Sequence, residues 1–405
     1  MGNARTLLPL TIPALVIGVG AALLLTGVSR AAEELSRLLW LPESPWWTLL
    51  MLTLGGFLTG LILWKVPGHG GPDPATEGLV APPIPVSAVP GVLLALSVTL
   101  AFGVSLGPEN PTIVANVALA TALGHRFFPR APLPIWTALA VAGTVGALFG
   151  TPVAAALLLS ESPSENRAPL WDRLVAPLVA AGAGALTVHL VSPGLTFTLG
   201  LPPYRGFQPL DLVTGSVLAT LGCALGLAAA YALPRVHRFA HRIGHPVVLL
   251  TLGGLVLGVR GVIGGRITLF KGLEQMQELA RDPGAFSAPR LALIVAVKLA
   301  ALVVAASFGF RGGRIFPSVF LGVAFGMLAA ALVPGVPMAL AVACAAMGVC
   351  VAVSRGGWLS LFIGAVLVGG SELLPVLCVA ILPAWLLATG RPEMRADAVA
   401  SPSPG

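Results

Sequence analysis

The sequence is interrupted twice in the same way, at Gly103-Val104-Ser105-Leu106-Gly107-Pro108-Glu109-Asn110-Pro111 and at Gly309-Phe310-Arg311-Gly312-Gly313-Arg314-Ile315-Phe316-Pro317. In each stretch glycines let the backbone turn, and a proline stands where the first turn of a following helix tolerates it. A shift of 206 residues aligns the two, pairing Gly103 with Gly309, Gly107 with Gly313 and Pro111 with Pro317. The shared layout predicts two homologous halves in which a helix is broken at the same place.

The composition around these stretches is that of a membrane protein. Of the 405 residues 56% are apolar and only 10% are charged, and the mean hydropathy is +0.93. So few charges cannot cover soluble domains, which excludes a soluble enzyme, a nucleic-acid-binding protein and a disordered chain. The 49 Gly and 36 Pro indicate broken helices around a cavity, because irregular backbone at membrane depth must be satisfied by protein or by enclosed water.

Apolar runs fill the chain and leave no room for a soluble domain between them. They lie at 7–28, 46–64, 86–106, 113–123, 135–159, 174–191, 212–233, 247–259, 291–308, 319–333, 338–353, 359–368 and 373–387. Some reach the roughly 20 residues needed to cross a bilayer and others are shorter. We expect an all-α polytopic membrane protein, with one transmembrane domain over 1–394, two inverted-topology halves at about 1–200 and 201–394, and a short disordered tail at 395–405.

Cysteines and histidines give no sign of a metal or cofactor. The four cysteines lie in apolar runs without ligand spacing, and His237, His241 and His245 belong to a basic segment that begins at Pro234. We expect that segment to be a cytoplasmic loop, because Lys and Arg gather on the cytoplasmic side. The sequence therefore predicts no cofactor, no metal, no nucleic acid and, in the absence of a P-loop, no nucleotide.

The chemistry of the two interruptions favours an anion. Each leaves helix N-terminal N–H groups unpaired, and each such end carries about half a positive charge. Glu109, an ionisable group at membrane depth, is a functional candidate. Its carboxylate would compete with an anion for the helix ends, so protonation would open the path; the alternative is an acid that only complements the dipole. Arg314 either raises the local anion concentration or faces an aqueous vestibule.

These residues resemble the motifs of the CLC family of chloride channels and chloride/proton exchangers. The stretch 107–111 is similar to the family's Gly-(Lys/Arg)-Glu-Gly-Pro motif, whose glutamate is the external gate. The stretch 312–318 resembles Gly-Xaa-Phe-Xaa-Pro, with Ile315 where the Phe usually stands. Gly68-His69-Gly70-Gly71-Pro72 occupies the place of Gly-Ser-Gly-Ile-Pro. The likeness covers about residues 45 to 394.

The resemblance implies a homodimer with one anion path per subunit and Glu109 as the gate. It implies that anions are bound mainly by backbone N–H groups at helix ends near 68–72, 109–111 and 315–317. The anion-binding residues expected on this basis are His69, Gly70, Gly71, Asn110, Ile315, Phe316 and Met394. The proton pathway expected is Glu109 with Glu161.

Several of these positions depart from the family pattern. His69 replaces a serine and either donates to the anion or points away from it, and Asn110 is either an amide donor or only a helix N-terminal residue. Met394 falls near the family's coordinating tyrosine, and a thioether cannot donate a hydrogen bond. The internal glutamate of exchangers falls on Ser162, beside Glu161.

The function expected is transport of chloride or a similar small anion across a cell membrane (an inner or plasma membrane), as a channel or a weakly proton-coupled exchanger. A fluoride/proton antiporter is the alternative within the family, because its members also depart at the serine and tyrosine positions. A non-transporting membrane sensor is the alternative outside transport. The sequence contains neither a nucleophile paired with a base nor a set of metal ligands, so it gives no indication of an enzyme. The partners expected are the anion, protons, lipid and a second copy of the chain.

Overall fold

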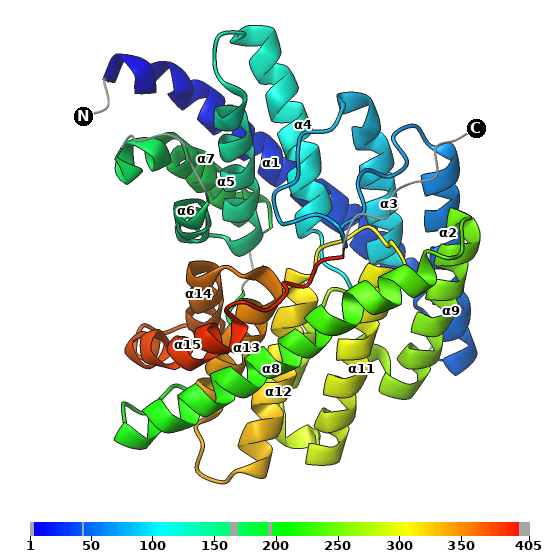
Figure 1. The fold of residues 1–405 in the computed structure, drawn as a ribbon, viewed down its shortest axis with the longest axis vertical. Helices are drawn as coiled ribbons and strands as arrows, with labels where there is room; N and C mark the ends of the chain where they lie inside the picture. Colours follow the sequence, from blue (N-terminus) through cyan, green and yellow to red (C-terminus); the bar gives the residue numbers. More distant parts are fainter. Residues whose placement is uncertain (1–3, 43, 163–168, 193–196, 397–405) are drawn as a thin grey trace.

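The computed structural model describes residues 4–42, 44–162, 169–192 and 197–396, and within these ranges the fold is helical, with a single isolated β-bridge (Figure 1). The first half contains α1 (Ala4–Leu39), α2 (Pro45–Lys65), α3 (Val89–Ala101), α4 (Glu109–Phe127), α5 (Leu133–Phe149), α6 (Pro152–Glu161) and α7 (Leu170–Val191). The second contains α8 (Pro209–Ala240), α9 (Pro246–Gly264), α10 (Leu273–Arg281), α11 (Ala288–Ser307), α12 (Ile315–Leu332), α13 (Met338–Ser354), α14 (Gly357–Val368) and α15 (Leu374–Ala388).

The two interruptions end and begin helices at equivalent residues. Helices α3 and α11 end at Ala101 and Ser307, and α4 and α12 begin at Glu109 and Ile315, each pair separated by 206 residues. The turns start at Gly103 and Gly309 with φ of 81° and 82°, a left-handed conformation that glycine adopts without a steric penalty. In Figure 1, α4 and α12 leave the centre of the molecule in opposite directions. These observations confirm the predicted all-α architecture with broken helices and inverted halves.

Helix length divides the bundle into spanning and non-spanning elements. Among the described residues, seven helices are long and apolar enough to cross a membrane: α1, α2, α7, α8, α9, α11 and α12. The other apolar helices, such as α5, α6 and α14, are shorter, as the apolar runs predicted. The basic segment at Pro234 is not a loop, because α8 continues through it to Ala240 and carries it in its last turns.

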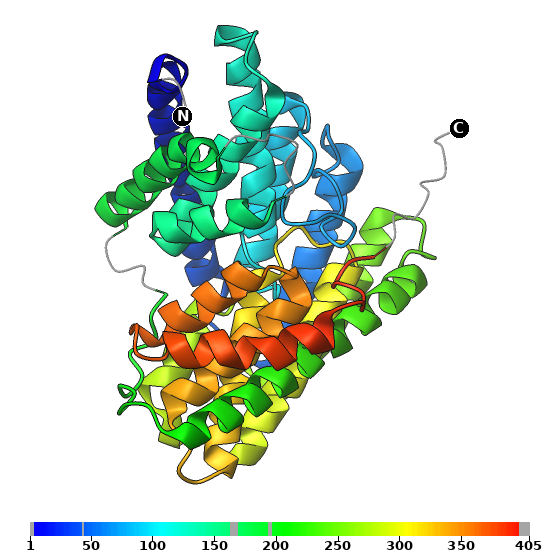
Figure 2. The ribbon, with the colours of Figure 1, turned by 60° about the vertical axis from the view of Figure 1, so that its left-hand side comes forward.

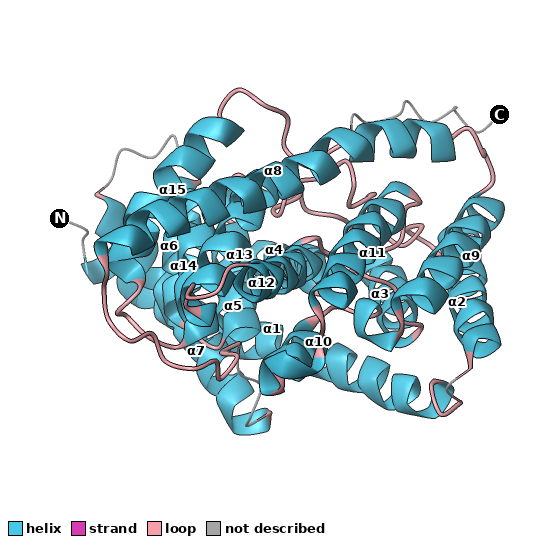
Figure 3. Cartoon of the chain, turned by 90° about the horizontal axis from the view of Figure 1, so that it is seen from below, coloured by secondary structure: helices cyan, strands magenta, loops and turns pink. Residues whose placement is uncertain are grey.

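The two halves lie on either side of the molecule's middle (Figure 2). Helices of the first half occupy one end and most of the second half the other, while α2 of the first half packs beside α9 of the second. Seen along the perpendicular direction, α4 and α12 lie near the middle with the other helices around them (Figure 3). The interrupted helices are therefore enclosed by protein, which satisfies their irregular backbone.

Glycine also brings helices into close contact, a use that the composition alone did not indicate. On α8 a Cβ added at Gly222 would lie 2.4 Å from the carbonyl oxygen of Ala345, and on α13 one added at Gly348 would lie 2.0 Å from that of Ala219. Small residues at such contacts let backbones approach within a membrane, where dispersion replaces the hydrophobic effect as the driving force. Part of the glycine content therefore serves packing rather than the interruptions.

Replacing Gly348 with Ala is expected to lower the free energy of unfolding by about 1–3 kcal/mol, because the added methyl group meets a backbone oxygen that cannot move aside. Thermal unfolding of the purified protein in detergent measures the effect. Gly182→Ala in α7 is the matched control, since nothing lies within 4 Å of its added Cβ. Equal melting temperatures for the two variants would contradict close α8–α13 packing.

The predicted tail at 395–405 lies mostly outside the described residues. Its first two residues, Arg395 and Ala396, are described, and Ala396 is buried. The Ala396 N–H donates to the carbonyl oxygen of Ala75 at 2.8 Å, so the chain is held in place at least to this point.

Candidate functional site

The two interruptions meet at the centre of the molecule. The N–H of Gly107 donates to the carbonyl oxygen of Gly313 at 2.9 Å, and the N–H of Gly313 donates to that of Gly107 at 2.7 Å. This isolated antiparallel bridge joins the segments that precede α4 and α12. The N-terminus of each helix is thereby fixed beside the other, and both positive dipole ends face one small region.

The Glu109 side chain crosses from α4 to the N-terminus of α12. Its Oε1 accepts hydrogen bonds from the N–H groups of Ile315 at 2.7 Å and Phe316 at 3.1 Å. The residue is 2% exposed, and its Oε2 has no hydrogen-bond partner within the described ranges. The carboxylate thus occupies a helix-end position that would otherwise attract a free anion.

Glycine leaves room for this carboxylate on both sides. A Cβ added at Gly107 would lie 2.0 Å from Glu109 Oε2, and one added at Gly313 would lie 2.1 Å from its Cδ. No side chain fits at either position while Glu109 is in place. The bridge that joins the interruptions therefore also forms the walls of the slot that holds the carboxylate.

A row of cavities approaches Glu109 from one side. A cavity of about 500 Å³, which we call the vestibule, is lined by polar side chains of α1, of α10 and of the segment before α10. Among them are Glu33 of α1 and Lys271, just before α10, which form an ion pair at 2.9 Å. Both residues also line a second cavity of about 80 Å³, which reaches Pro108 and Phe316. Phe316 in turn lines a cavity of about 10 Å³ together with Glu109. Shared lining residues place the three cavities next to one another, up to the carboxylate.

A fourth cavity continues on the other side of Glu109. It measures about 60 Å³, shares Leu79, Glu109 and Ile315 with the smallest cavity, and is called here the Arg314 cavity. Arg314 donates through Nη2 to the carbonyl oxygen of Glu77 at 2.8 Å, whereas its buried Nη1 has no partner among the residues the structure describes. Arg314 therefore brings a charged donor to the lining of this cavity.

Two of the predicted anion-binding side chains line the Arg314 cavity. Asn110 is buried, but its Nδ2 donates to the carbonyl oxygen of Gly78 at 2.9 Å. Met394 is fully buried there and presents no donor. Ile315 and Phe316 contribute backbone N–H groups, which Glu109 occupies.

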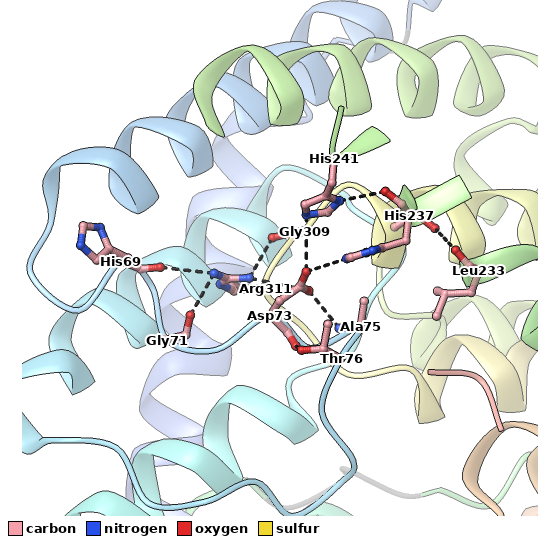
Figure 4. A network of polar contacts seen from close by, with 11 residues as sticks. His69, Gly71, Asp73, Ala75, Thr76, Leu233, His237, His241, Gly309 and Arg311 are labelled. Atoms are coloured by element: carbon pink, nitrogen blue, oxygen red, sulfur yellow. Dashed lines mark hydrogen bonds and ion pairs between the residues drawn. The ribbon is translucent and has the colours of Figure 1, made fainter. Parts of the chain in front are cut away.

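The segment 68–72 does not begin a helix; the helix end nearest to it is the C-terminus of α2 at Lys65, which does not present the unpaired N–H groups expected there. After α2 ends at Lys65 the chain forms a loop, with positive φ at Gly68, His69, Gly70 and Gly71. Buried Arg311 donates to the carbonyl oxygens of His69, Gly70 and Gly71 at 3.3, 2.9 and 2.9 Å. The N–H groups of His69 and Gly71 donate within the turn, to the carbonyl oxygens of Val66 at 3.0 Å and Gly68 at 2.8 Å. The His69 ring is directed away from Arg311 (Figure 4), and its Nδ1 lies 2.9 Å from the carbonyl oxygen of Leu63.

Arg311 thus ties the second interruption to this loop. It also donates to Gly309 at 3.2 Å and lies 3.9 Å from Asp73. Arg311→Met should lower the free energy of unfolding by about 3–5 kcal/mol, since it leaves buried carbonyls and Asp73 without their cation. Arg290→Met, which loses one hydrogen bond at 2.8 Å to Gly264, should cost about 1 kcal/mol. Thermal unfolding in detergent compares them, and equal losses would contradict this role for Arg311.

The predicted proton-pathway residues lie apart. Glu161 ends α6 and accepts a hydrogen bond from the Trp358 N–H at 2.8 Å, at the beginning of α14. It lines neither of the cavities that contain Glu109. Glu393, which the sequence did not single out, lines the Arg314 cavity and has a side chain 42% exposed. No local pattern in the sequence, two residues after Arg391, indicates that Glu393 lines this cavity. Its place there depends on how the end of the chain packs.

Comparison with known proteins identifies the family to which the chain belongs. A family model described as voltage gated chloride channel matches residues 55–389. The chain belongs to this family, the CLC family. Curated relatives from Salmonella newport (strain SL254) and Salmonella typhimurium (strain LT2), each named "Putative ion-transport protein YfeO", are 50% identical over 405 residues, covering 98% of this chain and 98% of each relative.

Solved CLC structures share the fold. A CLC-type fluoride/proton antiporter superposes with a TM-score of 0.81 at 22% identity, covering 98% of this chain and 100% of the other. A slow cyanobacterial Cl⁻/H⁺ antiporter also gives 0.81, at 18% identity and 97% coverage of both. These matches confirm the predicted CLC-like fold. The chain is an integral membrane protein of the CLC family of anion transport proteins. Members of this family are ion channels and transporters rather than enzymes.

Proposed function

We propose that the chain moves chloride or a similar small anion along the row of cavities, with Glu109 as the gate. The observation that carries the proposal is the Glu109 carboxylate on the N–H groups of Ile315 and Phe316. An anion arriving through the vestibule requires the same donors, so it and the carboxylate exclude each other. Charge-assisted hydrogen bonds of this kind are worth about 1.5–3 kcal/mol each, which makes the carboxylate an effective block.

Protonation of Glu109 would release this block. A neutral carboxyl group forms weaker hydrogen bonds to the helix end, and the anion's full charge is then favoured there. Arg314, with Nη1 unpaired in the next cavity, offers a second charged donor on the far side of the gate. Backbone N–H donors and one guanidinium together would replace the hydrating water that the anion loses. The path would not need the tyrosine hydroxyl that Met394 replaces.

The test is flux from liposomes that contain the purified protein. We expect chloride release faster than from empty liposomes, and faster at acidic than at neutral pH. Release no faster than from empty liposomes for chloride, bromide, nitrate and fluoride would overturn transport and would favour a membrane sensor. The same preparation decides whether chloride moves with protons, because a pH electrode records both together.

We propose weak proton coupling, with Glu393 rather than Glu161 as the acid that exchanges protons with solvent. Glu393 lines the Arg314 cavity with Glu109 and is partly exposed, whereas Glu161 is held at the N-terminus of α14. Glu393→Gln should reduce chloride-driven proton movement by about tenfold or more, and Glu161→Gln should leave it near the wild-type value. Liposome assays with simultaneous proton recording compare the two; the reverse order would contradict this choice, and absent proton movement in the wild type would make the protein a channel.

Fluoride is the alternative substrate. It is smaller and more strongly hydrated than chloride, and the 60 Å³ Arg314 cavity with its guanidinium donor suits such an ion. One of the solved structures with this fold is titled a fluoride/proton antiporter. Fluoride flux that exceeds chloride flux under matched gradients, and that chloride does not inhibit, would favour this alternative.

The family resemblance also leads us to propose a homodimer in a cell membrane, with 1–394 as one transmembrane domain and one anion path in each subunit. Helices of both halves expose large apolar side chains, including Trp171 on α7, Trp358 on α14 and Trp385 on α15. Mass measurement in detergent tests the state, and a monomer that retains full flux would contradict the dimer.

A further inference from the structure

A cluster of metal-ligating side chains lies outside the row of cavities, between the loop after α2 and the last turns of α8. His237 and His241 are one helical turn apart, with stacked rings whose centroids are 3.8 Å apart. Asp73 Oδ2 lies 3.0 Å from His237 Nε2 and 3.6 Å from His241 Nε2 (Figure 4). Three potential ligand atoms from two distant segments therefore converge, all within 4.8 Å of one another.

The spacing is close to that of a zinc site. Zn²⁺ binds imidazole nitrogen at about 2.0–2.1 Å and carboxylate oxygen at about 2.0–2.2 Å in tetrahedral geometry, which separates neighbouring ligand atoms by about 3.3–3.5 Å. The observed 3.0 and 3.6 Å fall on either side of this separation. Two imidazoles and one carboxylate are a ligand set that suits zinc, nickel or cobalt, and leave a position for water.

The hydrogen bonds of His241 leave a lone pair on its Nε2. His241 Nδ1 lies 3.0 Å from the carbonyl oxygen of His237, and a carbonyl only accepts, so the ring hydrogen is on Nδ1. Its Nε2 therefore faces the Asp73 carboxylate with a lone pair. A metal ion that displaces the His237 proton would satisfy all three ligand atoms.

The charges around the cluster permit a cation. Burial alone would raise the pKa of Asp73, but the His237 hydrogen bond and the Arg311 charge hold it below its usual value, so the carboxylate is ionised. Arg311 opposes a cation, yet its Nη1 is 3.9 Å from Oδ1, the oxygen that also accepts from the Ala75 N–H at 2.9 Å. The other oxygen faces the histidines, and the side chains of Asp73 and His241 are 21% and 24% exposed, which gives access from solvent.

We propose that Asp73, His237 and His241 bind one divalent transition-metal ion of the zinc, nickel or cobalt class. Bound metal joins the loop after α2 to the end of α8. The same loop supplies Pro74, Gly78 and Leu79 to the Arg314 cavity, so metal holds one wall of that cavity in place. Metal binding should therefore slow anion flux; this consequence rests on the proposed transport function, whereas the binding itself does not.

The binding test uses the full chain in detergent, freed of any polyhistidine tag and stripped with EDTA. Titration with Zn²⁺ by calorimetry, and with Co²⁺ by its visible absorption, should give one ion per chain. His237→Ala, His241→Ala and Asp73→Asn should each weaken binding by more than about tenfold. His245→Ala is the matched control, because His245 lies against Trp64 outside the cluster.

Thermal unfolding separates lost ligands from lost folding. Zinc should raise the melting temperature of the wild type and of His245→Ala, but not that of His241→Ala, whose partly exposed ring makes a poor candidate for a folding defect. No saturable binding of Zn²⁺ or Co²⁺, or binding that His241→Ala leaves unchanged, would overturn the site.

The flux test compares each protein with its own metal-free rate. Zinc should reduce wild-type and His245→Ala flux by more than about half, EDTA should restore it, and His241→Ala should be insensitive. Binding without any change in flux would overturn the coupling to the Arg314 cavity. If the wild type moves no anion at all, the transport proposal fails, and the calorimetric titration still decides the metal site.

Discussion

Glu109→Gln should raise chloride flux at neutral pH by about tenfold or more and should abolish its acceleration by acid. The amide can still accept from the N–H groups of Ile315 and Phe316, now 2.7 and 3.1 Å from Oε1, but it carries no charge. Neutral hydrogen bonds are worth about 0.5–1.5 kcal/mol against about 1.5–3 kcal/mol for charged ones, and about 1.4 kcal/mol corresponds to a factor of ten. The variant therefore resembles the protonated wild type at every pH.

The measurement is initial chloride release from liposomes between pH 4.5 and 8. Asp282→Asn is the control for loss of an acidic group, because Asp282 is exposed and lines none of the cavities that lead to Glu109. It should leave both the rate and the pH profile at wild-type values. A Glu109→Gln profile that matches the wild type across this range would show that the carboxylate is not the gate.

Local signals in the sequence were sufficient for the broken helices. Left-handed glycines such as Gly103, prolines in the first helical turn and a register of 206 residues are short-range features, and the structure places helix ends where they predict. The same signals placed Glu109 at the start of α4. They did not predict that its carboxylate is held by α12 rather than by α4, because that contact depends on how the two halves meet.

Long-range partners explain the expectations that differ from the structure. The glycine-rich segment 68–71 is compatible with either N–H or carbonyl groups facing inward, and Arg311, 241 residues from Gly70, binds the carbonyl groups. His237 and Asp73 are 164 residues apart, so the histidines looked like part of a basic segment and not like ligands. Glu161 likewise meets Trp358 across 197 residues. Spacing within one segment contains no information on such pairs.

Arg314 is the residue whose charge should matter most for anion affinity. The residue lines the Arg314 cavity, and its buried Nη1 has no partner within the described ranges, so we propose that an anion that passes Glu109 is the acceptor that this group lacks. Arg314→Gln keeps a polar but shorter side chain and removes the charge. The half-maximal chloride concentration for flux should therefore rise by about tenfold or more, the value of one charge-assisted hydrogen bond.

Concentration dependence of chloride flux measures this shift, with thermal unfolding as the check that the variant is folded. Arg391→Gln is the matched control, because Arg391 is exposed, outside the Arg314 cavity, and contributes only its carbonyl oxygen to Arg355 at 2.6 Å. Arg314→Lys should be intermediate, since a lysine ammonium retains the charge but lacks the planar pair of donors that can hold Glu77 and the anion together. If all three variants share the wild-type half-maximal concentration, the anion passes without meeting Arg314, and the backbone N–H groups of α12 alone bind it.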